Sequence, residues 1–111
     1  MDLINEIGQK TRELETSVRM LRTTGTAYAE AERDYKILLR TECLRLRDEG
    51  YAIGMIDKTC YGIPKVAEAR FKRDVAETVY KANLESINSI KLQIRILDNQ
   101  ISREWSTEMP N

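Results

Sequence analysis

The sequence predicts an all-α fold, a long antiparallel helical hairpin with coiled-coil character, from two observations. Apolar residues recur three and four positions apart over long stretches that contain little glycine or proline, as in amphipathic helices. A single interruption, residues 50–64 (GYAIGMIDKTCYGIP), holds three of the five glycines and one of the two prolines. Because Gly and Pro break helices, one helix ends here and another begins. Two such helices hide their apolar stripes by folding back on each other.

The first predicted helix covers about residues 3–48, with Asp2 as a plausible cap and Gly50 at the C-terminal capping position. Residues 23–26 (TTGT) weaken it, because Gly costs about 1 kcal/mol relative to Ala inside a helix. The apolar phase nevertheless continues beyond them. We therefore expect one helix, kinked or locally loosened near Gly25, in preference to two. Its apolar stripe consists of Leu3, Ile4, Ile7, Leu14, Val18, Leu21, Tyr28, Ala31, Tyr35, Leu38 and Leu39.

Residues 52–61 are expected to form a short linker helix ended by Gly62, because Ala52, Ile53, Met55 and Ile56 would be exposed in an open coil. Pro64 favours the first turn of a second long helix, about residues 64–105, since a first-turn residue needs no N–H partner. Residues 106–111 are predicted to be a flexible tail of a single helical domain, residues 1–111. Within the second helix, strict coiled-coil spacing is found at Ile87, Ile90, Ile94, Leu97 and Ile101.

Several leucines and isoleucines lie off this seam, which predicts that the hairpin does not stand alone. Two helices packed side by side bury one stripe each, and that burial must offset about 1–2 kcal/mol of backbone entropy for each ordered residue. We expect a homodimer or a larger helical bundle. The alternative is a monomer whose linker helix and bent first helix cover the extra residues. The candidate second seam comprises Leu38, Leu39, Leu44, Leu84, Leu92 and Ile96.

Composition excludes several function classes. The formal net charge is zero, which removes the simplest reason to expect a nucleic-acid binder. With no histidine and only two cysteines, Cys43 and Cys60, the chain lacks Ser-His-Asp and Cys-His catalysis and the common zinc sites. We expect reduced, partly buried thiols rather than a disulfide, and no metal, cofactor or catalytic residue. The N-terminus does not resemble a signal peptide, and no apolar run matches a membrane helix, so a cytoplasmic protein is expected.

The most site-like stretch is residues 58–65 (KTCYGIPK), at the start of the second long helix. It combines a hydroxyl, an aromatic side chain, a flexible glycine, several cations and a helix N-terminus, which together suit a phosphate or nucleotide. The phosphate-loop pattern is absent. Taken alone, the residues favour a plainer interpretation, in which Gly62 and Pro64 shape the turn and the cations are solvated. The candidate ligand-binding residues are Lys58, Thr59, Tyr61, Lys65, Arg70 and Arg73.

Two further hypotheses follow from charged residues. Glu30 and Asp34 lie four apart on one helix face and would hold Mg²⁺ if Glu68 or Asp74 lay opposite, as in helical nucleotide pyrophosphatases. Ordinary ion pairs with neighbouring cations are the favoured interpretation. Single-stranded nucleic acid is the other hypothesis, with arginines as phosphate contacts and tyrosines as stacking platforms, although interleaved acidic residues interrupt the positive track. The residues concerned are Arg40, Arg45, Arg47, Tyr51 and Tyr61.

Four segments, MDLINEI, AEAERDYK, GMIDK…YGIPKVAEARFKRD and SINSIKLQIRILDNQISREW, resemble small coiled-coil early-region proteins of tailed bacteriophages that infect Gram-positive bacteria. The resemblance covers nearly the whole chain and implies no catalytic residue. It implies a non-enzymatic binding protein in the host cytoplasm. Such a protein would antagonise host defence, either by binding a host protein or by sequestering a nucleotide signal. The alternative is an accessory to phage DNA recombination or replication that contacts single-stranded DNA or a DNA-processing enzyme.

Overall fold

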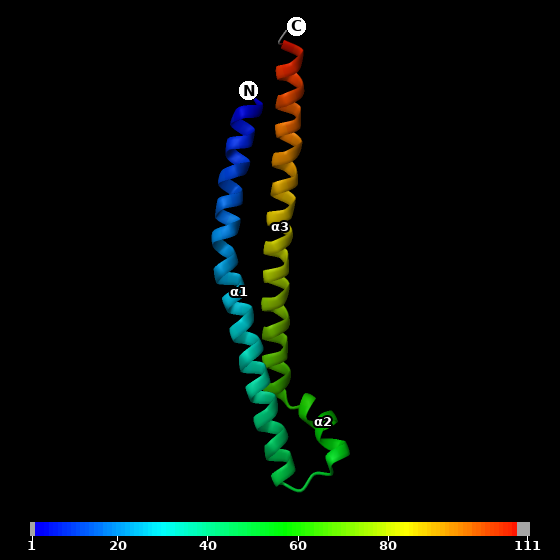
Figure 1. Ribbon diagram of the computed structural model, residues 1–111. Coiled ribbons are helices and arrows are strands. Elements are labelled where there is room, and N and C mark those ends of the chain that lie inside the picture. Colours follow the sequence, from blue (N-terminus) through cyan, green and yellow to red (C-terminus); the bar gives the residue numbers. More distant parts are fainter. Residues whose placement is uncertain (1, 109–111) are drawn as a thin grey trace. The chain divides into compact units, whose positions relative to one another are not determined.

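The protein is all-helical over residues 2–108, which are the residues that the computed structural model describes. Its three helices are α1 (Leu3–Asp48), α2 (Ile53–Tyr61) and α3 (Pro64–Glu108), and no strand occurs in this range (Figure 1). The predicted all-α antiparallel hairpin is confirmed. Helix α3 continues past its predicted end near residue 105 as far as Glu108. The last three residues of the predicted tail, 109–111, lie outside the described range.

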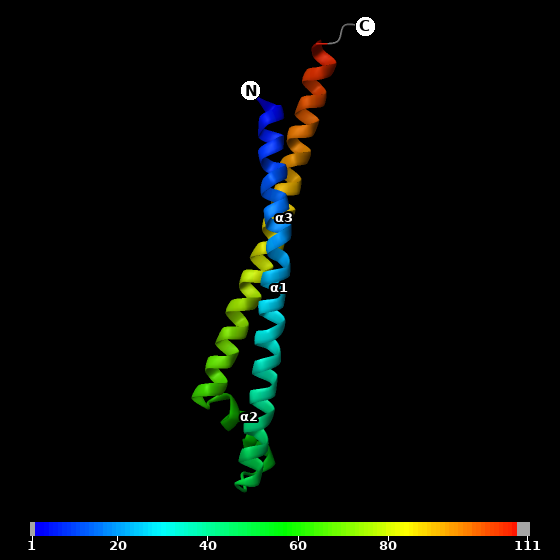
Figure 2. The ribbon, with the colours of Figure 1, turned by 90° about the vertical axis from the view of Figure 1, so that its left-hand side faces the viewer.

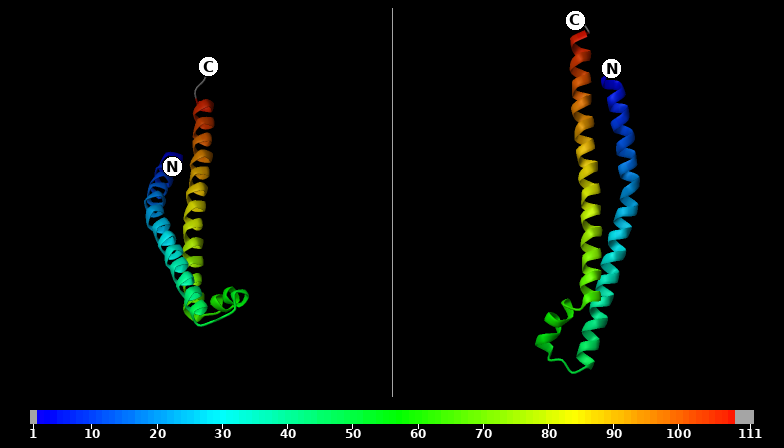
Figure 3. Two further views of the ribbon diagram at one scale, coloured as in Figure 1. Left: turned by 60° about the horizontal axis from the view of Figure 1, so that its bottom comes forward. Right: turned by 180° about the vertical axis from the view of Figure 1, so that it is seen from behind.

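The chain forms two compact units, each built from parts of the same two long helices. Unit 1 comprises Met1–Thr23 and Lys81–Asn111, and unit 2 comprises Thr24–Tyr80. Unit 1 therefore consists of the first part of α1 beside the last part of α3 (Figure 2). Unit 2 contains the rest of both helices and, in addition, α2 (Figure 3). Within each unit the segments of α1 and α3 run in opposite directions.

Helix α1 is unbroken through Gly25, so the prediction of one helix is confirmed. The glycine has a packing role in unit 2, because a Cβ built at Gly25 would come within 3.3 Å of the Tyr80 ring. The Tyr80 ring centroid lies 5.8 Å from that of Tyr28. A small residue at position 25 thus lets a tyrosine of α3 approach the α1 backbone and pack beside a second aromatic ring.

Gly50 ends α1 in the way its sequence position predicts. Its φ is +92°, in the left-handed region that favours glycine. The N–H of Gly50 donates to the carbonyl of Arg47 at 3.0 Å, and the N–H of Tyr51 donates to that of Leu46 at 3.1 Å. These two bonds form a Schellman motif, which satisfies carbonyls that the helix end leaves open. The motif fixes the direction in which the chain leaves α1 toward α2.

The core of unit 2 is formed where α2 packs against α1 and α3. Cys60 and Val66 are fully buried there. In unit 1, which has two helices, every described hydrophobic side chain is at least 6% exposed. In unit 1 the buried polar Asn83 donates from Nδ2 to the carbonyl of Ser17 at 3.0 Å. The core cluster of unit 2 comprises Tyr35, Leu46, Ile56, Cys60 and Val66, with Leu38, Leu39, Cys43, Ile63 and Ala69 packed against it.

The predicted coiled-coil seam of α3 faces inward in unit 1. Ile87 and Ile90 are buried, and Ile94, Leu97 and Ile101 are half-buried. The candidate second seam is not a single exposed stripe. Two of its members, Leu38 and Leu39, pack against the core of unit 2, because α2 covers that side of α1. Three others are more than half exposed: Leu44, Leu92 and Ile96.

Candidate functional site

All six candidate ligand-binding residues lie in unit 2, on two consecutive helices. Lys58, Thr59 and Tyr61 belong to α2, and Lys65, Arg70 and Arg73 belong to the first turns of α3. Their side chains do not form one group of free cations. Lys65 and Arg73 instead pair with carboxylates of α1, as the following contacts show.

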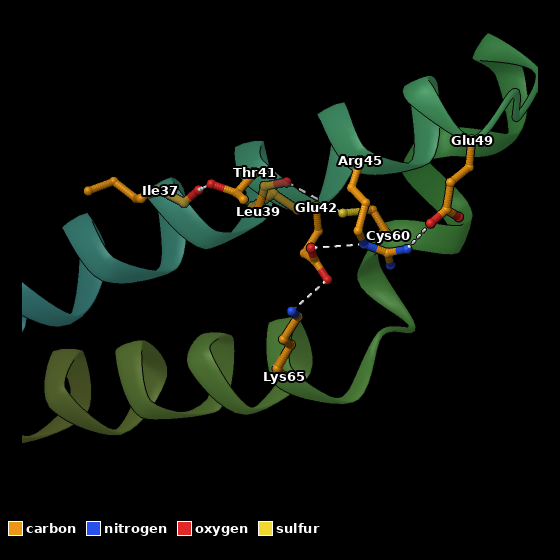
Figure 4. Close-up of polar contacts among 8 residues, drawn as sticks. All are labelled: Ile37, Leu39, Thr41, Glu42, Arg45, Glu49, Cys60 and Lys65. Carbon is orange, nitrogen blue, oxygen red and sulfur yellow. Dashed lines mark hydrogen bonds and ion pairs between the residues drawn. The ribbon is translucent and has the colours of Figure 1, made fainter.

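Glu42 of α1 is a buried carboxylate at the centre of an ionic cluster whose other members are more exposed (Figure 4). Its side chain is 3% exposed, with Oε1 3.0 Å from Lys65 Nζ and Oε2 3.2 Å from Arg45 Nε. The Nη1 of Arg45 also donates to Glu49 Oε1 at 2.6 Å. Hydrogen bonds from Lys65 and then from Arg45 lower the pKa of Glu42, although burial acts in the opposite direction. The cluster therefore connects α1 to the start of α3, and it explains why a carboxylate is tolerated at this depth.

Arg73 is held in a similar way, about two turns further along α3 than Lys65. Its Nη1 lies 3.2 Å from Glu32 Oε1, and its Nε lies 2.7 Å from Asp74 Oδ1. The guanidinium carbon is 4.7 Å from the ring centroid of buried Tyr35, a cation–π distance. The side chain is only 22% exposed. Arg73 is thus already occupied by two carboxylates and an aromatic ring.

The remaining candidates are more open to solvent. Arg70 and Tyr61 are both exposed, and the Arg70 guanidinium carbon lies 5.9 Å from the Tyr61 ring centroid. Lys58 is exposed and Thr59 is half-buried. An anion approaching this face would meet Arg70 and Lys58, whereas Lys65 is paired with Glu42 and Arg73 with Glu32 and Asp74. The proposed anion site stays a prediction.

Two of the carboxylates considered for Mg²⁺, Asp34 and Glu68, line one cleft, but two lysines line it as well. Asp34 accepts a hydrogen bond from Arg33 Nε at 3.1 Å, so it has the ordinary ion pair that the sequence favoured. It also lines a shallow cleft of about 370 Å³ together with Lys65, Glu68 and Lys72, where cations and anions alternate. Across residues 2–108, no group of three or more His, Cys, Asp or Glu side chains is placed to hold a metal ion.

Sequence reasoning missed an apolar surface at the turn between α1 and α3. The linker helix was expected to bury its apolar residues, but only Ile56 and Cys60 of α2 are buried. Those two residues lie four positions apart on one helix face, so Met55 falls on another face and Ile53, at the first turn, is left uncovered. The four-residue spacing of Ile56 and Cys60 could have indicated from the sequence that Ile53 and Met55 stay exposed. Exposed fractions are 53% for Leu44, 45% for Tyr51, 83% for Ile53 and 53% for Met55, and we call these four residues the tip surface.

A cleft of about 340 Å³ opens within the tip surface. Leu44 of α1 and Ile53 of α2 line it together with Cys43, Ile56, Arg47 and Asp57. Its wall is therefore mainly apolar, and one cation and one anion lie at its edge. Such a composition suits an apolar side chain of a partner better than a phosphate.

Cys43 and Cys60 are free cysteines in the structure. Cys60 is fully buried, and its thiol donates to the carbonyl of Leu39 at 3.5 Å (Figure 4). Cys43 is half-buried on α1. Burial, and to a lesser extent the hydrogen bond with Cys43, raise the pKa of Cys60 to about 11.

Among residues 2–108, no helix has both the length and the apolar character needed to cross a membrane. Searches against protein-family models, curated proteins and solved structures found no match to this chain.

Proposed function

We propose that this chain is a non-enzymatic, phage-type helical binding protein that antagonises a host defence by binding a host protein through the tip surface. The exposure of Leu44, Tyr51, Ile53 and Met55 carries the proposal. Large apolar side chains are normal on a protein surface when they are scattered, but two of these four, Leu44 and Ile53, line one cleft, which is typical of an interaction site. Ile53, which is 83% exposed, is the natural anchor.

The tip surface is held in place by ordered neighbours, which favours tight binding. Below it, Ile56 and Cys60 fasten α2 to the core. On one side, the Schellman motif at Gly50 fixes the turn out of α1. A surface that is already ordered loses little conformational entropy when a partner binds.

Charge pairing in unit 2 favours a protein partner over a nucleotide or a nucleic acid. A phosphate at Lys65 would compete with Glu42, whose side chain is only 3% exposed, for the Lys65 ammonium group. If the Lys65 contact were lost, the buried Glu42 carboxylate would keep only its contact with Arg45, which is unfavourable. Arg45, which was considered for single-stranded DNA, is held by Glu42 and Glu49 in the same network. An apolar partner side chain in the cleft requires none of these contacts to break.

Self-association remains part of the proposal. Leu92 and Ile96 lie four apart on α3 of unit 1 and are 52% and 54% exposed. Residues four apart share a helix face, so these two form a short apolar strip that a second copy would cover. The strip belongs to unit 1 and the tip surface to unit 2, so the two surfaces have no residue in common.

The test is site-specific photo-crosslinking in infected host cells that carry a defence system. A photoreactive residue at position 53 should capture one protein of the defence system, whereas the same residue at position 4 should not, although Ile4 is 71% exposed. Ile53→Asp should abolish the interaction of purified components and the rescue of phage plating, and Ile4→Asp should preserve both. Circular dichroism would confirm that both variants fold.

Two outcomes would contradict the proposal. If Ile53→Asp and Ile4→Asp lost phage rescue equally, the tip surface would have no special role. If native mass spectrometry instead found a small ligand of nucleotide mass that was retained by Ile53→Asp and lost by Arg70→Ala, sequestration of a nucleotide would replace protein binding as the function.

A further inference from the structure

Cys43 and Cys60 lie together where α2 packs on α1. The thiol of Cys60 donates to the carbonyl of Leu39 at 3.5 Å, which places its sulfur against α1. Cys43 is one helical turn beyond Leu39, and side chains four apart on a helix have Cβ atoms about 5–6 Å from each other. Cys43 packs against the cluster that contains Cys60. Cysteines of facing helices that pack in one cluster are candidates for a bridge, which requires Cα atoms within about 7 Å of each other.

The two thiols differ in access. Cys43 is half-buried and lines the cleft of the tip surface together with Leu44 and Ile53, so a small molecule that enters the cleft meets this residue. Cys60 has no exposed surface at all. An external reagent must therefore react first at Cys43, and Cys60 can react only with a group already attached there.

We propose that Cys43 and Cys60 form a thiol–disulfide exchange site whose substrate is a small disulfide such as oxidised glutathione. In the first step, the Cys43 thiolate attacks one sulfur of that molecule, its S–S bond breaks and one glutathione thiolate leaves. In the second step, the Cys60 thiolate attacks the Cys43 sulfur of the mixed disulfide and releases the second glutathione. Two protein thiols lose two protons and two electrons, and oxidised glutathione becomes two molecules of reduced glutathione.

The second step should be slow at neutral pH, because burial raises the pKa of Cys60 to about 11 and the thiolate is the reactive form. The groups that act on this thiol are Cys43 and Glu42 of α1 and Asp57 of its own helix, and each of them also raises its pKa. As long as the pH is well below that pKa, the thiolate fraction and the closure rate should rise about tenfold for each pH unit.

The new bond would fasten α2 to α1. In the reduced protein, only Ile56 and Cys60 of this nine-residue helix are buried. Local opening of such an element is easier than unfolding of the whole protein. Cross-linking removes much of the freedom of the opened state, so proteolysis between residues 49 and 63 should slow by about tenfold or more.

The experiment incubates the protein with defined ratios of reduced and oxidised glutathione, quenches it with an alkylating agent and determines the intact mass. Wild type should lose two hydrogens and then resist alkylation, and peptide mapping should join Cys43 to Cys60. Cys60→Ala should stop as a single glutathione adduct at Cys43, whereas Cys43→Ala should remain unmodified. The rate at which the isolated mixed disulfide converts to the Cys43–Cys60 disulfide should rise about tenfold for each pH unit.

Alanine at either cysteine keeps the site apolar, and circular dichroism would verify the fold of both variants. Modification of Cys60 in Cys43→Ala as fast as that of Cys43 in Cys60→Ala would overturn the assigned order. A wild-type protein that stops at the mixed disulfide, or that forms only disulfides between molecules, would overturn the exchange site itself.

Discussion

The two compact units use the same pair of helices but differ in how well they bury their side chains. Unit 1 contains only segments of α1 and α3. Its most buried hydrophobic side chains among the described residues are Ile87, which is 6% exposed, and Ile90, which is 9% exposed. In unit 2 the short helix α2 is added, and Cys60 and Val66 become fully buried. Two helices packed side by side leave the edges of their apolar contact exposed to solvent, and a third helix covers one of these edges. Nine residues of α2 thus turn an open seam into a core.

The buried polar groups of the two units also differ in kind. Asn83 in unit 1 donates a neutral hydrogen bond to the carbonyl of Ser17. Glu42 in unit 2 is an ionised carboxylate that contacts Lys65 and Arg45. Unit 2 should therefore respond to pH through this cluster, whereas the buried asparagine has no titratable group.

The largest expected effect is the loss of a core leucine from unit 2. Leu46 is 3% exposed, so Leu46→Ala leaves a cavity in the three-helix core and should lower the free energy of unfolding by about 3 kcal/mol. Leu97 is half-buried in unit 1, and Leu97→Ala should cost about 1 kcal/mol, because less area is lost and no closed cavity forms. Urea denaturation of the two variants measures the difference. Equal losses would show that α2 does not produce a better-packed core.

A smaller effect is expected from the ionic cluster, and its sign depends on pH. The folded-state pKa of Glu42 is lowered from its ordinary value of 4.5. The pair therefore contributes stability that is present above that value and is lost as the pH falls through the lower folded-state pKa. Glu42→Gln should destabilise the protein most near neutral pH, and its difference from wild type should shrink in acid. Urea titrations across the acid range would show this, and a constant difference would contradict it.

Local sequence signals predicted the helices well because each signal acts within a few residues. Gly50 marks the end of α1, since its left-handed φ suits only a glycine at little cost. Pro64 marks the start of α3. The coiled-coil spacing that includes Ile87 and Ile90 marks the face of α3 that is buried in unit 1. None of these assignments required knowledge of which residues meet across the hairpin.

The candidate site was harder to predict because it depends on partners that are distant in sequence. Lys65 looked like a free cation, but pairing of α1 with α3 brings Glu42 to it. Ile53 looked like a residue that α2 would bury, but the register of that helix buries Ile56 instead. One sequence cannot fix such a register, since either face of a short apolar helix could in principle face the core. The tip surface therefore emerges only from the packed structure.

The smallest expected effects concern two glycines that flank the start of α2, the element that unit 1 lacks. Gly50 has a φ of +92°, so Gly50→Ala should destabilise the protein by about 1 kcal/mol. Gly54 lies inside α2, and a Cβ there would meet nothing within 4 Å. Gly54→Ala should stabilise the protein by about 0.5 kcal/mol, because alanine favours the helix and restricts the unfolded chain. Opposite shifts of the urea midpoint would support this assignment, whereas two stabilising shifts would mean that Gly50 does not need its left-handed conformation to begin the turn into α2.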